Sequence, residues 1–271
     1  MNKILHLSDL HFGTEDPQVV LALQQLAEEQ QTQLNLLSGD ITQRARRRQF
    51  ADAVKFMQQL PGPTLAVPGN HDLPLFNLPA RVFNPYGNYR RAFGERLEPL
   101  YETSELLVIG LNTTHPARHV DGAVTQAQIE RVSGLLNQAK PEQLRIIMQH
   151  HPVCAVEGSD VANLLINREQ AVPAWTDAGM DILLAGHIHL PYILPLQGTQ
   201  NNRRAWAVQA GTGVSQRIRG NVPNSVNVIE YLGSHTEPSC CLARWDYAAD
   251  NQRFELVRRS PLALSRPTNR E

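Results

Sequence analysis

The sequence predicts an α/β fold, in which short buried strands alternate with amphipathic helices over the first 190 residues. Five apolar runs of strand length lie at residues 4–5, 34–37, 65–67, 146–148 and 182–185, and residues with helical apolar spacing lie between several of them. A polar cluster follows each of these five runs. Beyond them the helices disappear, and a β-rich end is expected from strand-like segments at residues 206–209, 225–232, 239–246 and 254–258.

The first hundred residues are expected to form two helices between the first three strands. Asp16 is a good N-cap and a proline follows it, so a helix is predicted over residues 17–29. A second helix is predicted over residues 44–60, where a Pro-Gly-Pro sequence ends it. Residues 73–101 are rich in Pro, Asn, Tyr and Arg, which indicates a long loop with a short helix. Loops of that length often carry function.

The second half continues the alternation up to the last polar cluster. An apolar strand is predicted over residues 106–111, and Thr125 is expected to cap a helix whose apolar residues recur at helical spacing. After the strand over residues 145–148, helices are expected at residues 161–166 and 170–178. The strand over residues 182–185 then leads to the fifth cluster.

Length and composition predict one domain in a reducing compartment. The 271 residues are ample for a large core, and we expect one domain over residues 1–259 with a loosely held tail over residues 260–271. The three cysteines form no disulfide framework, and the N-terminal residues lack a signal peptide, so a cytoplasmic location is expected. The net charge of −1 gives no broad reason to expect nucleic acid or membrane as a partner.

The polar clusters that follow the five strands carry groups that bind divalent metals. Open α/β sheets collect ligands at the carboxyl ends of their strands. In extended backbone, residues i and i+2 point to the same side, which would aim each Asp-x-His or His-x-His pair at one point. These donors are oxygen and imidazole groups, which favour Mn, Fe or Zn. Because no cysteine is among them, a zinc site made of thiolates is not expected. The clusters are Asp9-Leu10-His11, Gly39-Asp40, Gly69-Asn70-His71-Asp72, His150-His151-Pro152 and Gly186-His187-Ile188-His189.

This ordered set of motifs resembles the calcineurin-like metallophosphoesterase superfamily, and within it the bacterial branch that includes class III cyclic-nucleotide phosphodiesterases. The resemblance extends over residues 5–189, about two thirds of the chain, and every motif is intact. It implies a four-layer sandwich, in which two mixed β-sheets face each other and helices flank them.

The resemblance also implies a division of the donors between two divalent metal ions. One ion would be held by Asp9, His11 and His189, the other by Asn70, His150 and His187, and Asp40 would bridge both. Two cations about 3.5–4 Å apart can clamp the attacking and leaving oxygens of a phosphoryl transfer. A bridging water would lose its proton near neutral pH and become the nucleophile.

His71 is predicted to act in catalysis rather than to bind metal, because a neighbour of Asn70 on a turn cannot easily share its ion. The resemblance implies that His71 contacts the phosphate and protonates the leaving oxygen. Asp72 would orient His71 or a ligand, or would simply belong to the turn. For isolated residues, a carboxylate that caps a helix or a histidine satisfied in the core is the ordinary explanation, and only the complete set outweighs it.

Several positions remain open from the sequence alone. His151 is the alternative to His150, because neighbouring side chains in extended backbone point in opposite directions. Arg44 begins a basic run, residues 44–48, that forms either a solvated helix face or a rim that attracts an anionic substrate. His119 is a further candidate for substrate binding. The glycine-containing segment over residues 211–220 lacks the P-loop pattern, which indicates a loop that borders the pocket.

The predicted activity is metal-dependent hydrolysis of a small phosphodiester, with a cyclic nucleotide as the leading substrate. The alternatives are a phosphomonoesterase or a nucleotide-lipid pyrophosphohydrolase that uses the same donors, and a binding scaffold without catalysis. A phosphomonoester carries an extra negative charge and benefits from nearby cations. Because none of the five motifs contains arginine or lysine, diesters are expected to be the better substrates.

Overall fold

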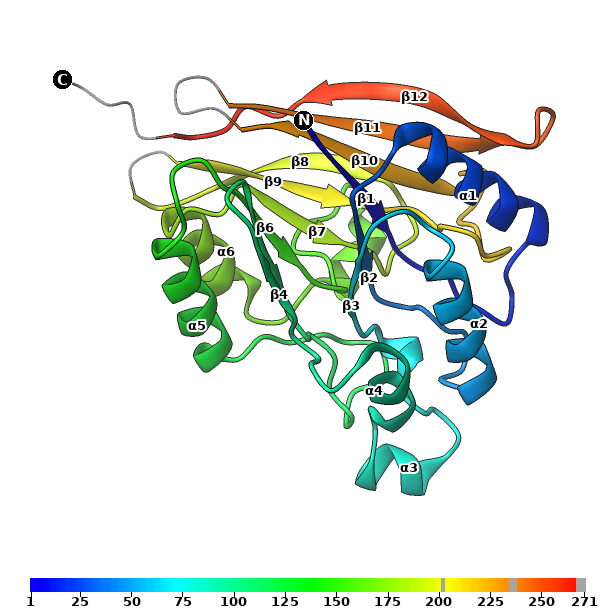
Figure 1. Ribbon diagram of the computed structural model, residues 1–271. Helices are drawn as coiled ribbons and strands as arrows, with labels where there is room; N and C mark the ends of the chain where they lie inside the picture. Colours follow the sequence, from blue (N-terminus) through cyan, green and yellow to red (C-terminus); the bar gives the residue numbers. More distant parts are fainter. Residues whose placement is uncertain (201–202, 234–237, 267–271) are drawn as a thin grey trace.

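The computed structural model describes residues 1–200, 203–233 and 238–266. Within these residues, two six-stranded sheets face each other, and helices cover the outer faces (Figure 1). The first sheet has the order β12-β11-β10-β1-β2-β3 and the second the order β4-β5-β6-β7-β9-β8. The predicted four-layer α/β sandwich is thereby confirmed.

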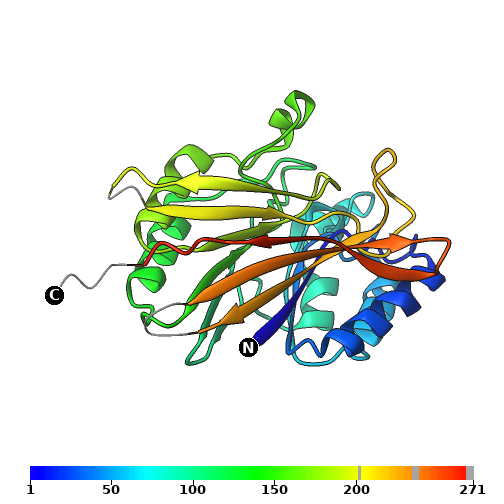
Figure 2. The ribbon, with the colours of Figure 1, turned by 90° about the horizontal axis from the view of Figure 1, so that it is seen from above.

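The strands of the first sheet come from both ends of the chain. They are β1 (Asn2–Leu7), β2 (Leu34–Ser38), β3 (Thr64–Val67), β10 (Ser225–Leu232), β11 (Ser239–Ala248) and β12 (Arg253–Pro261). Strand β1 pairs in parallel with β2 and antiparallel with β10, which places the N-terminal strand beside strands of the C-terminal region (Figure 2). The N-terminal motifs therefore lie on the same sheet as the β-rich end.

The second sheet is formed by the middle of the chain. It contains β4 (Leu100–Glu102), β5 (Leu106–Gly110), β6 (Leu144–Met148), β7 (Ile182–Ala185), β8 (Tyr192–Gln197) and β9 (Arg204–Gln209). Strands β5, β6, β7 and β9 are parallel, as are β1, β2 and β3 of the first sheet. The parallel strands deliver the polar clusters at their carboxyl ends.

Each sheet buries both faces, which explains why its strands are nearly continuous apolar runs. In β1, Ile4 belongs to the core between the sheets, whereas Leu5 belongs to the core beneath the helices of the first sheet. In β6, Ile146 and Ile147 alternate in the same way. The helices are α1 (Pro17–Gln30), α2 (Arg47–Met57), α3 (Leu78–Phe83), α4 (Gly87–Phe93), α5 (Gln126–Asn137) and α6 (Arg168–Asp177).

Two helices begin at the predicted caps, and a third helix begins later in the sequence than predicted. Asp16 accepts a hydrogen bond from the backbone of residue 18, and Thr125 accepts one from residue 128, so both predicted caps are confirmed. Helix α2 begins at Arg47 rather than at Arg44. Ala45 has a φ of 52° and the following residue is extended, and these conformations exclude a helix before residue 47.

One other prediction about elements was wrong, and strands β4 and β8 were not predicted. Residues 161–166 do not form an α-helix, because a short 3-10 helix (Gly158–Asn163) ends there and Leu164 is extended. Strand β8 was not predicted, since Pro195 lies within it. A proline lacks the N–H that an inner strand must donate, and β8 accordingly lies at the edge of its sheet.

The C-terminal segment is held more firmly than a loose tail over residues 260–271 would be. Strand β12 continues through Ser260 to Pro261, and Leu262 is only 4% exposed. Arg266 pairs with buried Asp181, at 2.9 Å between Nη2 and Oδ2. The expectation of a loose tail was therefore wrong for residues 260–266, and residues 267–271 lie outside the described part.

Two absences among the described residues bear on the earlier expectations. None of their helices is both long enough and apolar enough to cross a membrane. The three cysteines, Cys154, Cys240 and Cys241, are free thiols.

Candidate metal centre

The loops that follow five parallel strands bring the predicted donors together at the seam between the two sheets. The loops after β1, β2 and β3 come from the first sheet, and those after β6 and β7 come from the second. Two groups of ligand atoms that each lie within 4.8 Å of one another are Asp9, His11 and His189, and Asp40, His150 and His187. The structure thus assembles donors that are up to 180 residues apart in the sequence.

In the first group, two imidazole nitrogens and a carboxylate oxygen converge. The Nε2 atom of His189 lies 3.3 Å from Oδ1 of Asp9 and 3.3 Å from Nε2 of His11. The other nitrogen of His189, Nδ1, donates to the carbonyl oxygen of Arg217 at 2.9 Å, which leaves Nε2 as an acceptor. Buried Oδ1 of Asp9 has no hydrogen-bond partner among the described residues. Two imidazole nitrogens and a carboxylate oxygen at these distances fit a divalent metal ion.

The second group is built in the same way around His150. Its Nδ1 donates to the backbone oxygen of Ser38 at 2.8 Å, which directs Nε2 into the site. Burial lowers the pKa of His150, but the facing Asp40 carboxylate outweighs it and raises that pKa to about 9, so a metal ion would replace a proton on Nε2. This Nε2 lies 3.2 Å from Oδ1 of Asn70 and 3.3 Å from Oδ1 of Asp40. With the His187 ring beside it, this group also fits a metal ion.

Asp40 lies between the two groups, where a bridging ligand has to be. Its Oδ1 faces His150, and its Oδ2 lies 3.7 Å from Nε2 of His11. Burial alone would raise the pKa of Asp40, but the facing rings of His150 and His71 hold that pKa well below its usual range. The carboxylate is therefore ionised and can contact both ions.

Burial also keeps two of the imidazoles neutral. It lowers the pKa of His187 to about 3 and that of His11 well below its ordinary value. Neutral imidazole is the form that binds metal. In the same centre, burial and the nearby Asp40 charge raise the pKa of Asp72 to about 7.

The geometry distinguishes His150 from His151. Both ring nitrogens of His151 already have protein partners, since Nδ1 lies 2.7 Å from the hydroxyl of Thr113 and Nε2 lies 2.9 Å from the carbonyl oxygen of Val120. Its ring packs against that of His187, with 4.8 Å between centroids. His151 is placed to hold His187 in position, and His150 is the residue that faces the other donors.

The donors converge for a different backbone reason from the predicted one. Asp9 and His11 are not extended, because they lie beyond the end of β1 and have φ values of 53° and 44°. Left-handed backbone also occurs at Asp40, His187 and His189. Such conformations are uncommon for residues other than glycine and concentrate at functional sites. The prediction that i and i+2 share a face in extended backbone was therefore wrong, although the side chains do meet.

The glycines before the donors serve two purposes. Gly39 has a φ of 91°, which a residue with a side chain rarely adopts. Gly69 has ordinary extended backbone, but a Cβ atom there would overlap the backbone of Asp40, and one at Gly186 would overlap the hydroxyl of Ser8. The donor loops can therefore approach one another closely only because these positions carry no side chain.

Asp72 fixes the relative position of two donor loops. Its carboxylate accepts from the backbone N–H groups of Ile41 and Thr42, at 3.1 and 2.8 Å, and from that of Gly69 at 2.9 Å. It thus ties the loop that carries Asp40 to the loop that carries Asn70. This gives Asp72 the positioning role that the sequence left open.

A cavity beside the donors contains three more of the predicted residues. It has a volume of about 120 Å³, and His71, Arg44 and His119 line it together with Asn70. The backbone N–H of His71 donates to Asp40 at 2.8 Å, and the Nδ1 of His71 lies 3.0 Å from the carbonyl oxygen of Gln43. The guanidinium of Arg44 also lies over the ring of Phe76, 5.6 Å from its centroid. A ring nitrogen of His71 lies within 4.8 Å of the ligand atoms of His11 and Asp40, which is close enough for the three residues to contact the same bound group.

Arg217 brings a positive charge to the site that the motifs did not contain. Its Nη1 lies 3.4 Å from Nδ1 of His11, 3.4 Å from Nε2 of His71 and 3.0 Å from Oε1 of Gln43. Its neighbour Arg219 faces elsewhere and pairs with Asp160. The motifs themselves contain no arginine, but the loop over residues 211–220 places Arg217 among the donors.

The loop after β9 explains how Arg217 reaches the site. Strand β9 is parallel to β7, so its carboxyl end opens at the same edge of the sheet. Thr212 and the backbone of Arg217 hold the His189 ring, and a Cβ at Gly213 would strike Leu10. A strand over residues 206–209 followed by a glycine-containing loop was the signal in the sequence. It marked the loop but not which arginine points inward.

Comparison with known proteins agrees with this geometry. Residues 2–191 match the family described as calcineurin-like phosphoesterase, which is more than half of the chain. The chain belongs to this family, whose members bind a dinuclear metal centre, and the family indicates a metal-dependent phosphoester hydrolase. The comparison with curated proteins gave no significant match.

Solved structures share the fold at low sequence identity. A purple acid phosphatase from yellow lupin has a TM-score of 0.67 at 11% identity, over 94% of this chain and 52% of that longer chain. A dimetal phosphatase from Danio rerio has a TM-score of 0.63 at 12% identity, over 97% of this chain and 99% of that one. The GAP50 anchor of the Plasmodium inner membrane complex has a TM-score of 0.59 at 12% identity, over 98% and 89% of the two chains.

Proposed function

We propose that this protein hydrolyses small phosphodiesters at a centre of two divalent metal ions. The observation that carries the proposal is the convergence of imidazole, amide and carboxylate ligand atoms in two groups, with ionised Asp40 between them. When bound, two such ions supply a nucleophile at neutral pH and neutralise charge on the phosphate. Oxygen and imidazole donors favour Mn, Fe or Zn.

The residues of the chain contribute position and a proton. With Nδ1 of His71 donating to the carbonyl oxygen of Gln43, its Nε2 is directed toward the site, and the doubly protonated ring can give a proton from Nε2 to the leaving oxygen. The hydrogen bond from its backbone to Asp40 fixes His71 against the bridging ligand. The small cavity lined by Arg44 and His119 provides space for an ester substituent next to His71.

Support for a diester comes from the motifs and from their resemblance to the branch with cyclic-nucleotide phosphodiesterases. The metal donors are neutral or acidic, and a singly charged phosphodiester needs few further cations. Arg217 favours the second candidate, a phosphomonoester, because its guanidinium can pair with the additional charge. Both candidates use the same two-metal chemistry.

A catalytically inactive scaffold is the remaining alternative, because the fold alone does not require catalysis. The chain resembles the GAP50 anchor in fold as well as two phosphatases. In this chain all seven predicted donors face one another, and a scaffold would have no need for that arrangement.

The test is turnover by protein loaded with Mn, Zn or Mg whose metal content has been measured. We expect about two ions per chain and hydrolysis of bis(p-nitrophenyl) phosphate with a higher kcat/KM than p-nitrophenyl phosphate. Cyclic AMP and 2′,3′-cyclic AMP then test the nucleotide assignment. Two bound ions without turnover of any ester would support the scaffold, and a clear preference for the monoester would support a phosphatase.

A further inference from the structure

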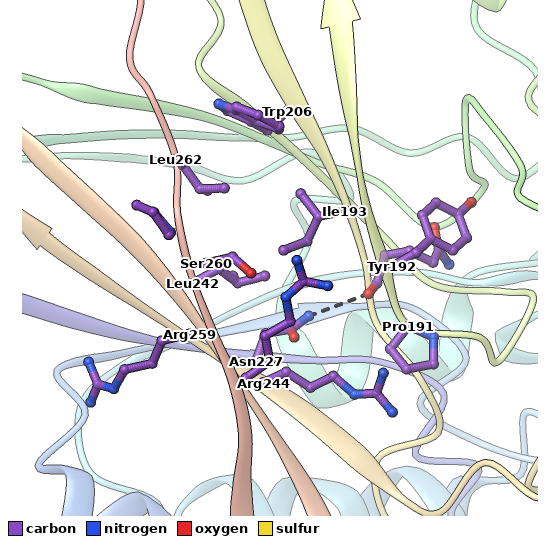
Figure 3. A pocket seen from close by; sticks show the side chains of 13 residues that line it. Pro191, Tyr192, Ile193, Trp206, Asn227, Leu242, Arg244, Arg259, Ser260 and Leu262 are labelled. Atoms are coloured by element: carbon purple, nitrogen blue, oxygen red, sulfur yellow. Dashed lines mark hydrogen bonds between the residues drawn. The ribbon is translucent and has the colours of Figure 1, made fainter.

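A second cavity opens between the edges of the two sheets, and none of the metal donors lines it. Its volume is about 430 Å³, within the range of about 300–1,000 Å³ that is common for small-molecule sites. Strands β8 and β9 form one side and β10, β11 and β12 the other. Ile193 and Trp206 face Leu242 and Leu262 across it (Figure 3). These side chains give the cavity an apolar wall.

Two buried amides form a polar part of the lining. Asn227 and Gln209 are 2% and 3% exposed. The amide nitrogen of Asn227 donates to the backbone oxygen of Gln209 at 3.5 Å and lies 3.4 Å from Nδ1 of His6. The side-chain amide nitrogen of Gln209 donates to the backbone oxygen of Gly186. The lining therefore combines an apolar wall with fixed polar groups, as in sites that select a ligand by orientation.

The cation at the rim comes from an unusual strand register. Arg244 of β11 lies directly opposite Arg258 of β12, next to a bulge, and like charges in that position destabilise a sheet. Asp246 neutralises Arg244, at 2.6 Å between Nη2 and Oδ2, but Arg258 has no hydrogen bond or ion pair to any described residue. An anion bound at this rim would relieve the repulsion.

We propose that this cavity binds a small amphipathic anion. Its apolar body would lie against Ile193, Trp206 and Leu242, and its acidic group would bind the guanidinium of Arg258. The proposal does not depend on the reaction at the metal centre, because the two sites share no lining residue.

Two dyes with the same aromatic skeleton test the proposal with metal-loaded protein. 8-Anilinonaphthalene-1-sulfonate carries an anionic group, and N-phenyl-1-naphthylamine lacks it. Titration calorimetry should show one saturable site for the sulfonate and weaker binding of the neutral dye. Arg258→Gln should weaken sulfonate binding by about five- to tenfold, the range for a charge-assisted contact at a partly exposed site. It should leave the neutral dye unchanged.

Ile193→Trp, which fills the cavity, should abolish binding of both dyes. The matched control is Arg253→Gln on the same strand, because Arg253 does not line the cavity and its loss should change neither affinity. Thermal melting verifies that the variants are folded. Absence of saturable binding would overturn the proposal. An equal loss of affinity for both dyes in Arg258→Gln would also overturn it. Unchanged binding in Ile193→Trp would overturn it as well, because the dye would then be bound to exposed apolar residues such as Phe83.

Discussion

Replacement of Arg217 by glutamine should discriminate between phosphomonoesters and phosphodiesters. A phosphate oxygen near His11 and His71 would lie about 4 Å from this guanidinium, because Nη1 is 3.4 Å from both rings. At that distance, one additional unit charge contributes about 4 kcal/mol at an effective dielectric constant of about 20. Arg217 is exposed, and water screens exposed pairs strongly. We therefore expect about 1–2 kcal/mol of selective loss for the monoester, about 5- to 30-fold in kcat/KM.

The assay compares p-nitrophenyl phosphate with bis(p-nitrophenyl) phosphate at matched metal content. Arg217→Gln should reduce kcat/KM for the monoester more than for the diester by that factor. Arg204→Gln is the control, because Arg204 is an exposed arginine at the start of β9, whereas the loop that carries Arg217 follows the end of that strand. Equal losses for the two esters would refute the reasoning and show that Arg217 only supports the His189 loop.

Three further predictions test the centre and its surroundings. His71→Ala should retain both ions in elemental analysis yet lower turnover by about 10²–10⁴-fold, whereas Asp40→Ala should lose both ions. If His71→Ala lost metal equally, His71 would be a ligand. His150→Ala should lose one ion and His151→Ala none, and the reverse result would exchange their roles. Burial lowers the pKa of His6 to about 3, so the folded protein should lose stability below pH 6.5 as the unfolded chain binds a proton. When the pH is lowered from 7.5 to 5, the free energy of unfolding measured in urea should fall by about 2 kcal/mol less for His6→Gln than for the unaltered protein. Equal decreases in the two proteins would contradict this.

Local patterns in the sequence predicted most of the buried strands and the donors that follow them, whereas the arrangement of two facing sheets and the division of the donors came from the family resemblance. Runs such as residues 182–185 are apolar throughout since both faces of the sheets are buried, and a polar donor immediately after such a run has to lie at a sheet edge. Interactions between distant loops were not predictable in this way. Arg217 reaches His71 across 146 positions, and the sequence indicated a loop beside the pocket but not which of its arginines makes the contact.

Local backbone conformation was the second feature that could not be predicted from the sequence. The left-handed backbone of Asp9 and His11 is imposed by their surroundings, and the residues themselves would favour the extended form that the sequence suggested. Ala45 delays helix α2 for the same reason. Strand β8 was missed because Pro195 contradicts a central strand but is compatible with an edge.

The placement of the donors on both sheets has a consequence for the lifetime of the protein. Asp9 belongs to the first sheet and His189 to the second, so bound ions would fasten the two halves of the sandwich to each other. An ion that binds only the folded chain adds its binding free energy to the free energy of unfolding. The supply of metal would then control how long each molecule resists unfolding and proteolysis, and starvation for metal would reduce the amount of the protein along with its activity.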